Sequence, residues 1–315
     1  MRLPPARSTR RARSGARGAL VGLLVATLLA ACGPATGGGA GGTGSDGGRL
    51  DVVASFYPLA YVAGQVGGRR VDVTMLTPPG AEPHDLELTA RQVGQLTQAD
   101  LVVYLAGFQP AVDTALTSDG GQPGATGPGR RVLEVGPVAG VHGGDPHFWT
   151  DPTRLAAVAG AVARRLAVLD PAGEAAYRAN ARALTSALTA LDRDYRAGLS
   201  SCRSRDLVVS HDAFGYLASR YHLSQMPIAG LDPQAEPSPT RLAALVRYVR
   251  AHHVTTVYTE TLVSPEVAQT LAREAGVRVG VLDPVEGLTD RSPGSDYLQI
   301  MRANLAALRQ GLGCR

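Results

Sequence analysis

The sequence is poor in cysteine and has no lysine: only three of its 315 residues are cysteine, and all 31 basic residues are arginine. Closely spaced cysteines, which hold many structural zinc ions, are therefore absent. The H-E-x-x-H segment of helical zinc hydrolase sites is missing as well. The lack of lysine suggests a codon bias more than a function. These absences exclude several compact metal motifs but leave open a site assembled from distant residues.

The charge of the chain is concentrated at its N-terminus. The formal net charge is +4, and six arginines lie within the first 17 residues, so the rest of the chain carries −2. The remaining chain therefore has no basic excess for binding nucleic acid, and we expect no nucleic-acid partner.

Residues 1–32 have the pattern of a bacterial lipoprotein signal. The six arginines precede an apolar run of about 14 residues, which is too short to span a hydrocarbon core about 30 Å thick. The run ends in Leu-Ala-Ala-Cys, which predicts that Cys32 is lipidated and becomes the mature N-terminus. A plain secretory signal is the alternative, and the Arg10-Arg11 pair leaves export by the general secretory or the twin-arginine route open.

Glycine-rich residues 33–48 cannot bury a core, and we interpret them as a flexible tether. Signal, tether and a following domain predict an extracytoplasmic protein that is anchored by its lipid to the outer face of the bacterial cell membrane.

Cys202 and Cys314 are the only other cysteines. In an exported protein an isolated pair is most simply a disulfide, which here would close a loop of about 110 residues. Two soft zinc ligands are the alternative, but they would need further cysteine or histidine at short spacing. We therefore predict a Cys202–Cys314 disulfide.

Beyond the tether, short apolar segments alternate with helical patterns. This alternation predicts α/β architecture with two lobes, 49–169 and 200–315, each a small, mostly parallel sheet flanked by helices. A purely helical stretch separates them, and residues 170–199 predict one long helix that joins the lobes. The predicted strands are 50–55, 71–76, 101–105, 132–135, 207–210, 256–259 and 277–282.

Three histidines and one carboxylate are placed where such a fold binds ligands. His211 and Asp283 directly follow predicted strands, His84 lies in the loop after strand 71–76, and His147 precedes the helical stretch. Ligands of open parallel sheets bind beyond the carboxyl ends of the strands, so two residues from each lobe would meet in the cleft between the lobes. Three imidazoles and a carboxylate suit tetrahedral Zn²⁺.

The other histidines fit ordinary structural roles. His142 is expected to be solvated, His222 ends a predicted helix, and His252 and His253 lie at a helix C-terminus. Two acidic residues, Glu82 and Glu260, are expected near the site, either as hydrogen-bond acceptors for imidazole N–H groups or as a weaker fifth ligand.

From Cys32 onward the chain resembles the metal-binding lipoproteins of bacterial ABC importers for zinc and manganese. The segments that carry this resemblance are PGAEPHD (79–85), DPHFWTDP (145–152), SHDAFGY (210–216), EPSP (236–239) and VLDP (281–284). The resemblance implies ligands at His84, His147, His211 and Asp283. It also implies a long linking helix, and a separately encoded permease and ATPase as partners.

The same resemblance favours zinc over manganese. Zinc-type members tend to have histidine at the third ligand, as His211 does here, and imidazole suits zinc. The long histidine-rich loop of many zinc members is missing, however, so Mn²⁺ stays open as cargo.

The predicted function is therefore that of a monomeric, non-enzymatic zinc-binding component of an ABC importer. A zinc hydrolase would keep one coordination position for water, which Asp283 would fill. A surface adhesin that uses metal only for stability is a third alternative.

Overall fold

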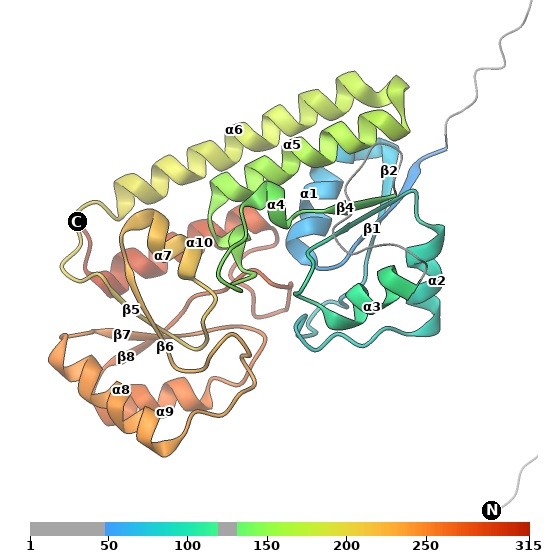
Figure 1. Ribbon diagram of the computed structural model, residues 1–315. Coiled ribbons are helices and arrows are strands. Elements are labelled where there is room, and N and C mark those ends of the chain that lie inside the picture. Colours follow the sequence, from blue (N-terminus) through green and yellow to red (C-terminus); the bar gives the residue numbers. More distant parts are fainter. Residues whose placement is uncertain (1–47, 119–130) are drawn as a thin grey trace, which may run out of the picture. The chain divides into compact units, whose positions relative to one another are not determined.

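In the computed structural model, which describes residues 48–118 and 131–315, the chain forms two four-stranded parallel sheets (Figure 1). Their strand orders are β2-β1-β3-β4 and β6-β5-β7-β8, so the second sheet repeats the topology of the first. The strands are β1 (Leu50–Ala54), β2 (Val71–Met75), β3 (Leu101–Tyr104), β4 (Val132–Glu134), β5 (Asp206–Val209), β6 (Ser224–Pro227), β7 (Thr256–Thr259) and β8 (Arg278–Val281).

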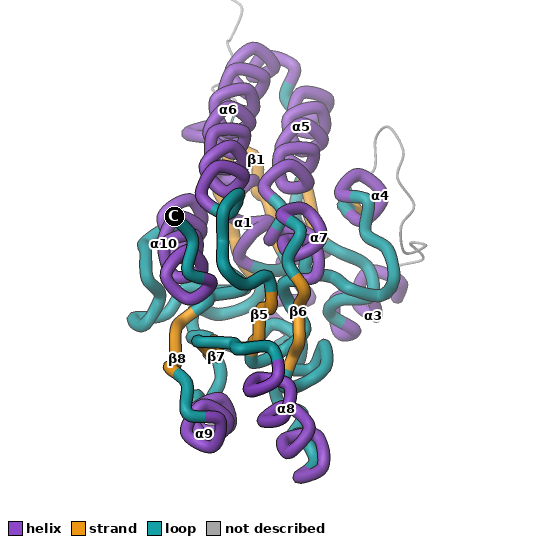
Figure 2. The backbone as a smooth tube through the Cα atoms, turned by 90° about the vertical axis from the view of Figure 1, so that its left-hand side faces the viewer, coloured by secondary structure: helices purple, strands orange, loops and turns teal. Residues whose placement is uncertain are grey.

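Helices cover both faces of each sheet (Figures 1 and 2). The helices are α1 (Tyr57–Gly67), α2 (Ala90–Gln98), α3 (Pro110–Ser118), α4 (Gly136–Ala139), α5 (Pro152–Leu169), α6 (Glu174–Gly198), α7 (Gly215–Tyr221), α8 (Pro239–Ala251), α9 (Glu266–Ala275) and α10 (Tyr297–Leu312). Short 3₁₀ turns are η1 (Gly68–Arg70), η2 (Phe148–Thr150) and η3 (Pro171–Gly173).

Alternate side chains of the first sheet enter two different cores. In β1, Val52 and Ala54 pack toward α1, α5 and α6, whereas Val53 packs with Leu96 of α2 and Val112 of α3. This is the period-two pattern of a strand that is buried on both faces. It explains why the strand segments of the sequence are continuous apolar runs.

The second sheet follows the same rule. Val208 of β5 packs with Leu245 of α8 and Leu271 of α9, whereas Leu207 and Val209 belong to the core shared with α6, α7 and α10. That shared core continues into the first lobe, where it includes the side chains that α1 and α5 bury. The two sheets are thus supported by one continuous apolar layer.

Helices α5 and α6 lie side by side along this layer (Figures 1 and 2). The side chain of Asp151 caps α5 by accepting the Thr153 N–H, and Pro152 occupies its first turn. The predicted helix 170–199 starts later than expected, because α6 begins at Glu174 and the 3₁₀ turn η3 precedes it. Asp170 does not cap the helix; its side chain pairs with Arg70 and Tyr177.

The predicted α/β class with two parallel sheets is confirmed. Strand β6 and helices α3 and α4 were not expected from the pattern, because they are short or partly exposed. The lobe boundaries at 169/170 and 199/200 stay a prediction. The signal peptide, Cys32 and residues 33–47 of the tether lie outside the described residues. Within the described part, no helix has both the length and the apolar character needed to cross a membrane.

Cys202 and Cys314 form the predicted disulfide, with an S–S distance of 1.97 Å and a sequence separation of 112 residues. The bond ties the segment after α6 to the C-terminal end of α10, at one end of the shared core. It therefore restricts the whole second lobe in the unfolded chain.

Replacing both cysteines by serine is expected to lower the free energy of unfolding by about 2–5 kcal/mol, because the unfolded chain regains the entropy of an open loop. Urea unfolding of the oxidised protein and the double variant measures the difference. Far-UV circular dichroism of the folded state serves as the control and should stay unchanged, since both cysteines lie outside the helices and strands. Equal midpoints for the two proteins would contradict the prediction.

Candidate metal centre

Three of the predicted ligands meet at the carboxyl ends of the strands. His84 lies in the loop between β2 and α2, His147 between α4 and η2, and His211 one residue after Ser210 at the end of β5. Both His147 and His211 are fully buried, whereas the side chain of His84 is 14% exposed. The loops carry these residues because parallel strands of each sheet end at the same edge.

The fourth member of this cluster is Glu286, and Asp283 contributes no atom to it. The expectation for Asp283 is thus corrected by the geometry. Its carboxylate accepts the Val285 N–H of its own loop at 2.7 Å and the Thr261 hydroxyl of the loop after β7 at 3.0 Å, so both oxygens have partners away from the cluster. Glu286 follows three residues later and reaches the imidazoles. The only sequence signal for Glu286 was an acidic residue shortly after a strand end.

The ligand atoms of the four residues all lie within 4.8 Å of one another. Glu286 Oε1 is 3.0 Å from His147 Nε2, 3.3 Å from His211 Nε2 and 3.5 Å from His84 Nε2. Tetrahedral zinc with bonds near 2.0–2.1 Å places its ligand atoms about 3.3 Å apart. The observed spacings therefore fit a single small cation.

Three buried atoms of this cluster lack a hydrogen-bond partner among the described residues: His211 Nε2 and both oxygens of Glu286. Glu286 Oε1 and His211 Nε2 nevertheless lie only 3.3 Å apart. Buried polar atoms are nearly always satisfied, so this convergence indicates a cation as the missing partner.

The outer nitrogens of the two buried imidazoles are held by carboxylates. His147 Nδ1 lies 2.7 Å from Asp145 Oδ1, and His211 Nδ1 lies 2.8 Å from Glu260 Oε1. The Ser210 hydroxyl donates to the same Glu260 oxygen. Carboxylates in this position fix the tautomer that leaves Nε2 free for a metal. Asp145 was missed by sequence reasoning, although its position two residues before His147 was a usable signal.

Glu82 lies beside the cluster without joining it. Its Oε1 accepts the backbone N–H of His84 at 3.2 Å, and its Oε2 has no partner among the described residues. Burial, helped by the charge of Glu286, raises the pKa of Glu82 to about 8. The hydrogen bond from the His84 N–H to Glu82 orients the loop of His84. It does not involve an imidazole nitrogen.

The pKa values of the cluster residues are shifted by the charges of their neighbours. Burial lowers the pKa of His211, but the carboxylates of Glu286 and Glu260 outweigh this effect and raise the pKa well above its usual range. In His147, Asp145 and Glu286 likewise outweigh burial and raise the pKa. Burial alone would raise the pKa of Glu286, yet the histidines hold it well below its usual range. The histidines therefore favour the charged form of the Glu286 carboxylate.

The backbone just before Glu286 is strained. Val285 has φ of 61°, in the left-handed region that a β-branched residue rarely adopts, and its side chain is fully buried. Such a conformation costs on the order of 1–3 kcal/mol and persists only where the surroundings enforce it. Contacts around this loop therefore enforce the conformation of Val285.

The remaining four histidines lie outside the cluster. His142 donates its backbone N–H to the Tyr216 hydroxyl, and His222 ends α7 with a left-handed backbone. His252 follows α8 and stacks on Tyr248.

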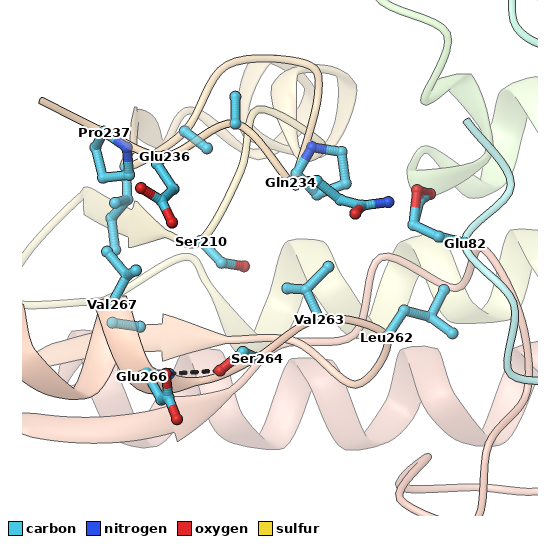
Figure 3. Close-up of a pocket in the computed structure, with 15 residues that line it drawn as sticks. Glu82, Ser210, Gln234, Glu236, Pro237, Leu262, Val263, Ser264, Glu266 and Val267 are labelled. Atoms are coloured by element: carbon cyan, nitrogen blue, oxygen red, sulfur yellow. Dashed lines mark hydrogen bonds between the residues drawn. The ribbon is translucent and has the colours of Figure 1, made fainter. Parts of the chain in front are cut away.

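A cavity of about 440 Å³ adjoins two of the ligand loops (Figure 3). Glu82 and Ser210 line it, each one or two residues before a histidine of the cluster, and Glu236 and Glu266 lie on its other walls. None of the four cluster residues lines the cavity. The exposed edge of His84 is the only part of the four side chains that solvent reaches.

Residues 52–311 match the family described as "Zinc-uptake complex component A periplasmic". The zinc-binding protein AdcA of Streptococcus pyogenes is 35% identical over 292 residues, which cover 83% of this chain and 56% of that protein. The chain thus spans about half the length of such relatives. The high-affinity zinc uptake system protein ZnuA of Bacillus subtilis is 33% identical, covering 85% of this chain and 89% of that protein.

A solved structure agrees with this match. The Zn(II)-bound ZnuA-like domain of Streptococcus pneumoniae AdcA superposes with a TM-score of 0.72 at 34% identity and covers 84% of this chain and 99% of that one. The family match begins within β1 and spans the rest of both sheets and all four loops of the cluster. The chain belongs to the zinc-uptake complex component A family.

Proposed function

We propose that this protein captures Zn²⁺ outside the cell membrane and delivers it to the permease of an ABC importer. The observation that carries the proposal is the buried cluster of His84, His147, His211 and Glu286, whose spacing fits one tetrahedral cation. The relatives support it, because their names describe zinc binding and zinc uptake. A permease and its ATPase are the partners that we propose, with anchorage through a lipid on Cys32.

Binding, and not catalysis, is what this donor set favours. A hydrolytic zinc site keeps a position for water, whereas four protein ligands close a tetrahedral shell. Glu286 is the fourth member of the cluster, the place for which the sequence predicts Asp283. The family to which the chain belongs consists of solute-binding components and not of enzymes.

The donor set also favours zinc over manganese. Three imidazole nitrogens and one carboxylate match zinc, whereas manganese prefers a set richer in oxygen. Asp145 and Glu260 each place one carboxylate oxygen at the Nδ1 of a buried imidazole, and neither belongs to the cluster of converging ligand atoms. We therefore propose Zn²⁺ as the main cargo and Mn²⁺ as a weaker competitor.

Metal analysis and competition titration test the cargo. The protein, purified without added metal and then stripped with a chelator, is expected to bind one Zn²⁺ and to bind Mn²⁺ more weakly. Because a ligand that binds only the folded state stabilises it by RT ln(1 + [L]/Kd), zinc at 100 times its Kd should add about 2.7 kcal/mol to the free energy of unfolding. Equal affinity for manganese would contradict zinc as cargo, and a stoichiometry of zero for both metals would contradict the function.

A further inference from the structure

We infer that Asp283 is a positioning residue, which holds the strained backbone at Val285 and thereby aims the Glu286 carboxylate at the three histidines. The inference rests on the proposed zinc-binding function. It gives Asp283 a task different from the ligand role that the sequence suggested. Three sets of contacts carry it.

The first set holds the strained peptide itself. Asp283 Oδ1 accepts the Val285 N–H at 2.7 Å, and Asp283 is only 1% exposed. Val285, with φ of 61°, is the last residue before Glu286. A carboxylate that accepts the N–H two residues further along the chain closes a tight local turn. This hydrogen bond therefore stabilises a backbone conformation that valine would otherwise avoid.

The second set fixes Asp283. Its backbone N–H donates to Asn304 Oδ1 at 3.0 Å, and its carbonyl accepts from Asn304 Nδ2 at 2.7 Å. Asn304 belongs to α10 and is fully buried. A side-chain amide that satisfies both backbone groups of one residue holds the peptide much as a neighbouring strand would. The turn is thus attached to a helix of the shared core.

The third set connects the turn to the segments of two other cluster residues. The Thr261 hydroxyl, next to the Glu260 that holds His211, donates to Asp283 Oδ2 at 3.0 Å. The indole of Trp149, two residues after His147, donates to the carbonyl of Pro284 at 2.7 Å. Residues 283–286 are therefore joined to the segments of His147 and His211 without any metal. Glu286 is already directed at the imidazoles when the cation arrives.

A comparison of two substitutions at Asp283 tests the inference. Asp283→Asn keeps an oxygen that can accept the Val285 N–H, whereas Asp283→Ala removes it. If Asp283 acts by positioning, Asp283→Ala should weaken zinc binding by about 10–100-fold, the usual effect of losing a group that orients a ligand. Asp283→Asn should weaken it by less than about threefold, because the hydrogen bond is retained.

A second substitution distinguishes positioning from a general loss of structure. Glycine adopts the left-handed region without strain. Adding Val285→Gly to Asp283→Ala should therefore raise the zinc affinity several-fold, which is on the order of half of the loss on a logarithmic scale. The absorption spectrum of bound Co²⁺ gives a readout independent of affinity. It should be the same for wild type and Asp283→Asn and altered for Asp283→Ala.

The outcomes separate the two claims. If wild-type protein binds no zinc, the proposed function fails. If wild type binds zinc and Asp283→Ala binds equally well, the positioning role fails. Loss of affinity in Asp283→Asn as large as in Glu286→Gln would instead make Asp283 a ligand and overturn the inference. Thermal unfolding of each metal-stripped variant shows whether the fold is retained.

Discussion

Replacing His147 by alanine is expected to reduce zinc affinity by at least about a hundred-fold. Apparent free energies of zinc binding to four-ligand protein sites are about 10–16 kcal/mol, which is roughly 3 kcal/mol per ligand, or slightly more than two powers of ten. His147 is fully buried and lies closest to Glu286, so a solvent ligand cannot easily replace it. Competition with a chromophoric zinc chelator measures the change.

Glu286→Gln should have an effect of similar size, because it removes the only carboxylate of the cluster. The matched control is His142→Ala, which removes a histidine of the same region that contributes no atom to the cluster and should change affinity by less than about twofold. A variant lacking His147 that still binds zinc like wild type would show that the cluster is not the site. A large effect of His142→Ala would place part of the site elsewhere.

Zinc affinity is expected to fall steeply as pH falls, and the fall should begin at a higher pH than for histidines of ordinary pKa. The pKa of His147 is raised and that of His211 is raised well above its ordinary value, so in the metal-free protein both imidazoles keep their protons to a higher pH than an ordinary histidine does. Zinc requires neutral imidazole and must displace these protons. The pKa of Glu286 is held well below its usual range, so its carboxylate stays charged and adds no proton to the exchange.

The slope follows from the number of protons displaced. Each proton released lowers the apparent affinity tenfold per pH unit, so two histidines give up to about a hundred-fold per unit below their pKa values. Histidines of ordinary pKa would give a plateau above about pH 6.5, whereas the raised values move the plateau upward. Calorimetric titration at pH 7 in buffers of different ionisation enthalpy counts the protons directly. An affinity that is constant from pH 5.5 to 7.5 would contradict a three-histidine site.

The stability of the metal-free protein should change with pH in the opposite sense. A histidine whose pKa is higher in the folded than in the unfolded state contributes stability below the unfolded value of about 6.5, and the contribution is lost as pH rises through the folded value. Zinc binding strengthens over the same range. The difference in melting temperature between zinc-loaded and metal-free protein should therefore widen as pH rises.

Most of the fold could be predicted from the sequence because its signals are local. Buried parallel strands require apolar runs, and Asp151-Pro152 and Ser238-Pro239 mark the starts of α5 and α8 as capping residues followed by proline. The short strand β6 (Ser224–Pro227) has no comparable signal, since it lies at an edge of the second sheet and none of its four residues is buried. Such elements form because a neighbouring strand offers hydrogen bonds, and their own residues show no pattern that predicts this pairing.

The sequence by itself determined the two-sheet architecture, the disulfide partners and the three histidines, because each follows from residue type and position relative to a strand. It could not decide between the two carboxylates of residues 283–286. Asp283 directly follows the strand, as a ligand of an α/β site usually does, and was the natural choice. Only the tertiary structure shows that Asn304 and Thr261 contact Asp283, that Val285 has a left-handed backbone, and that Glu286 reaches the histidines. The direction of a side chain in a loop depends on contacts with distant elements, and a local pattern does not contain them.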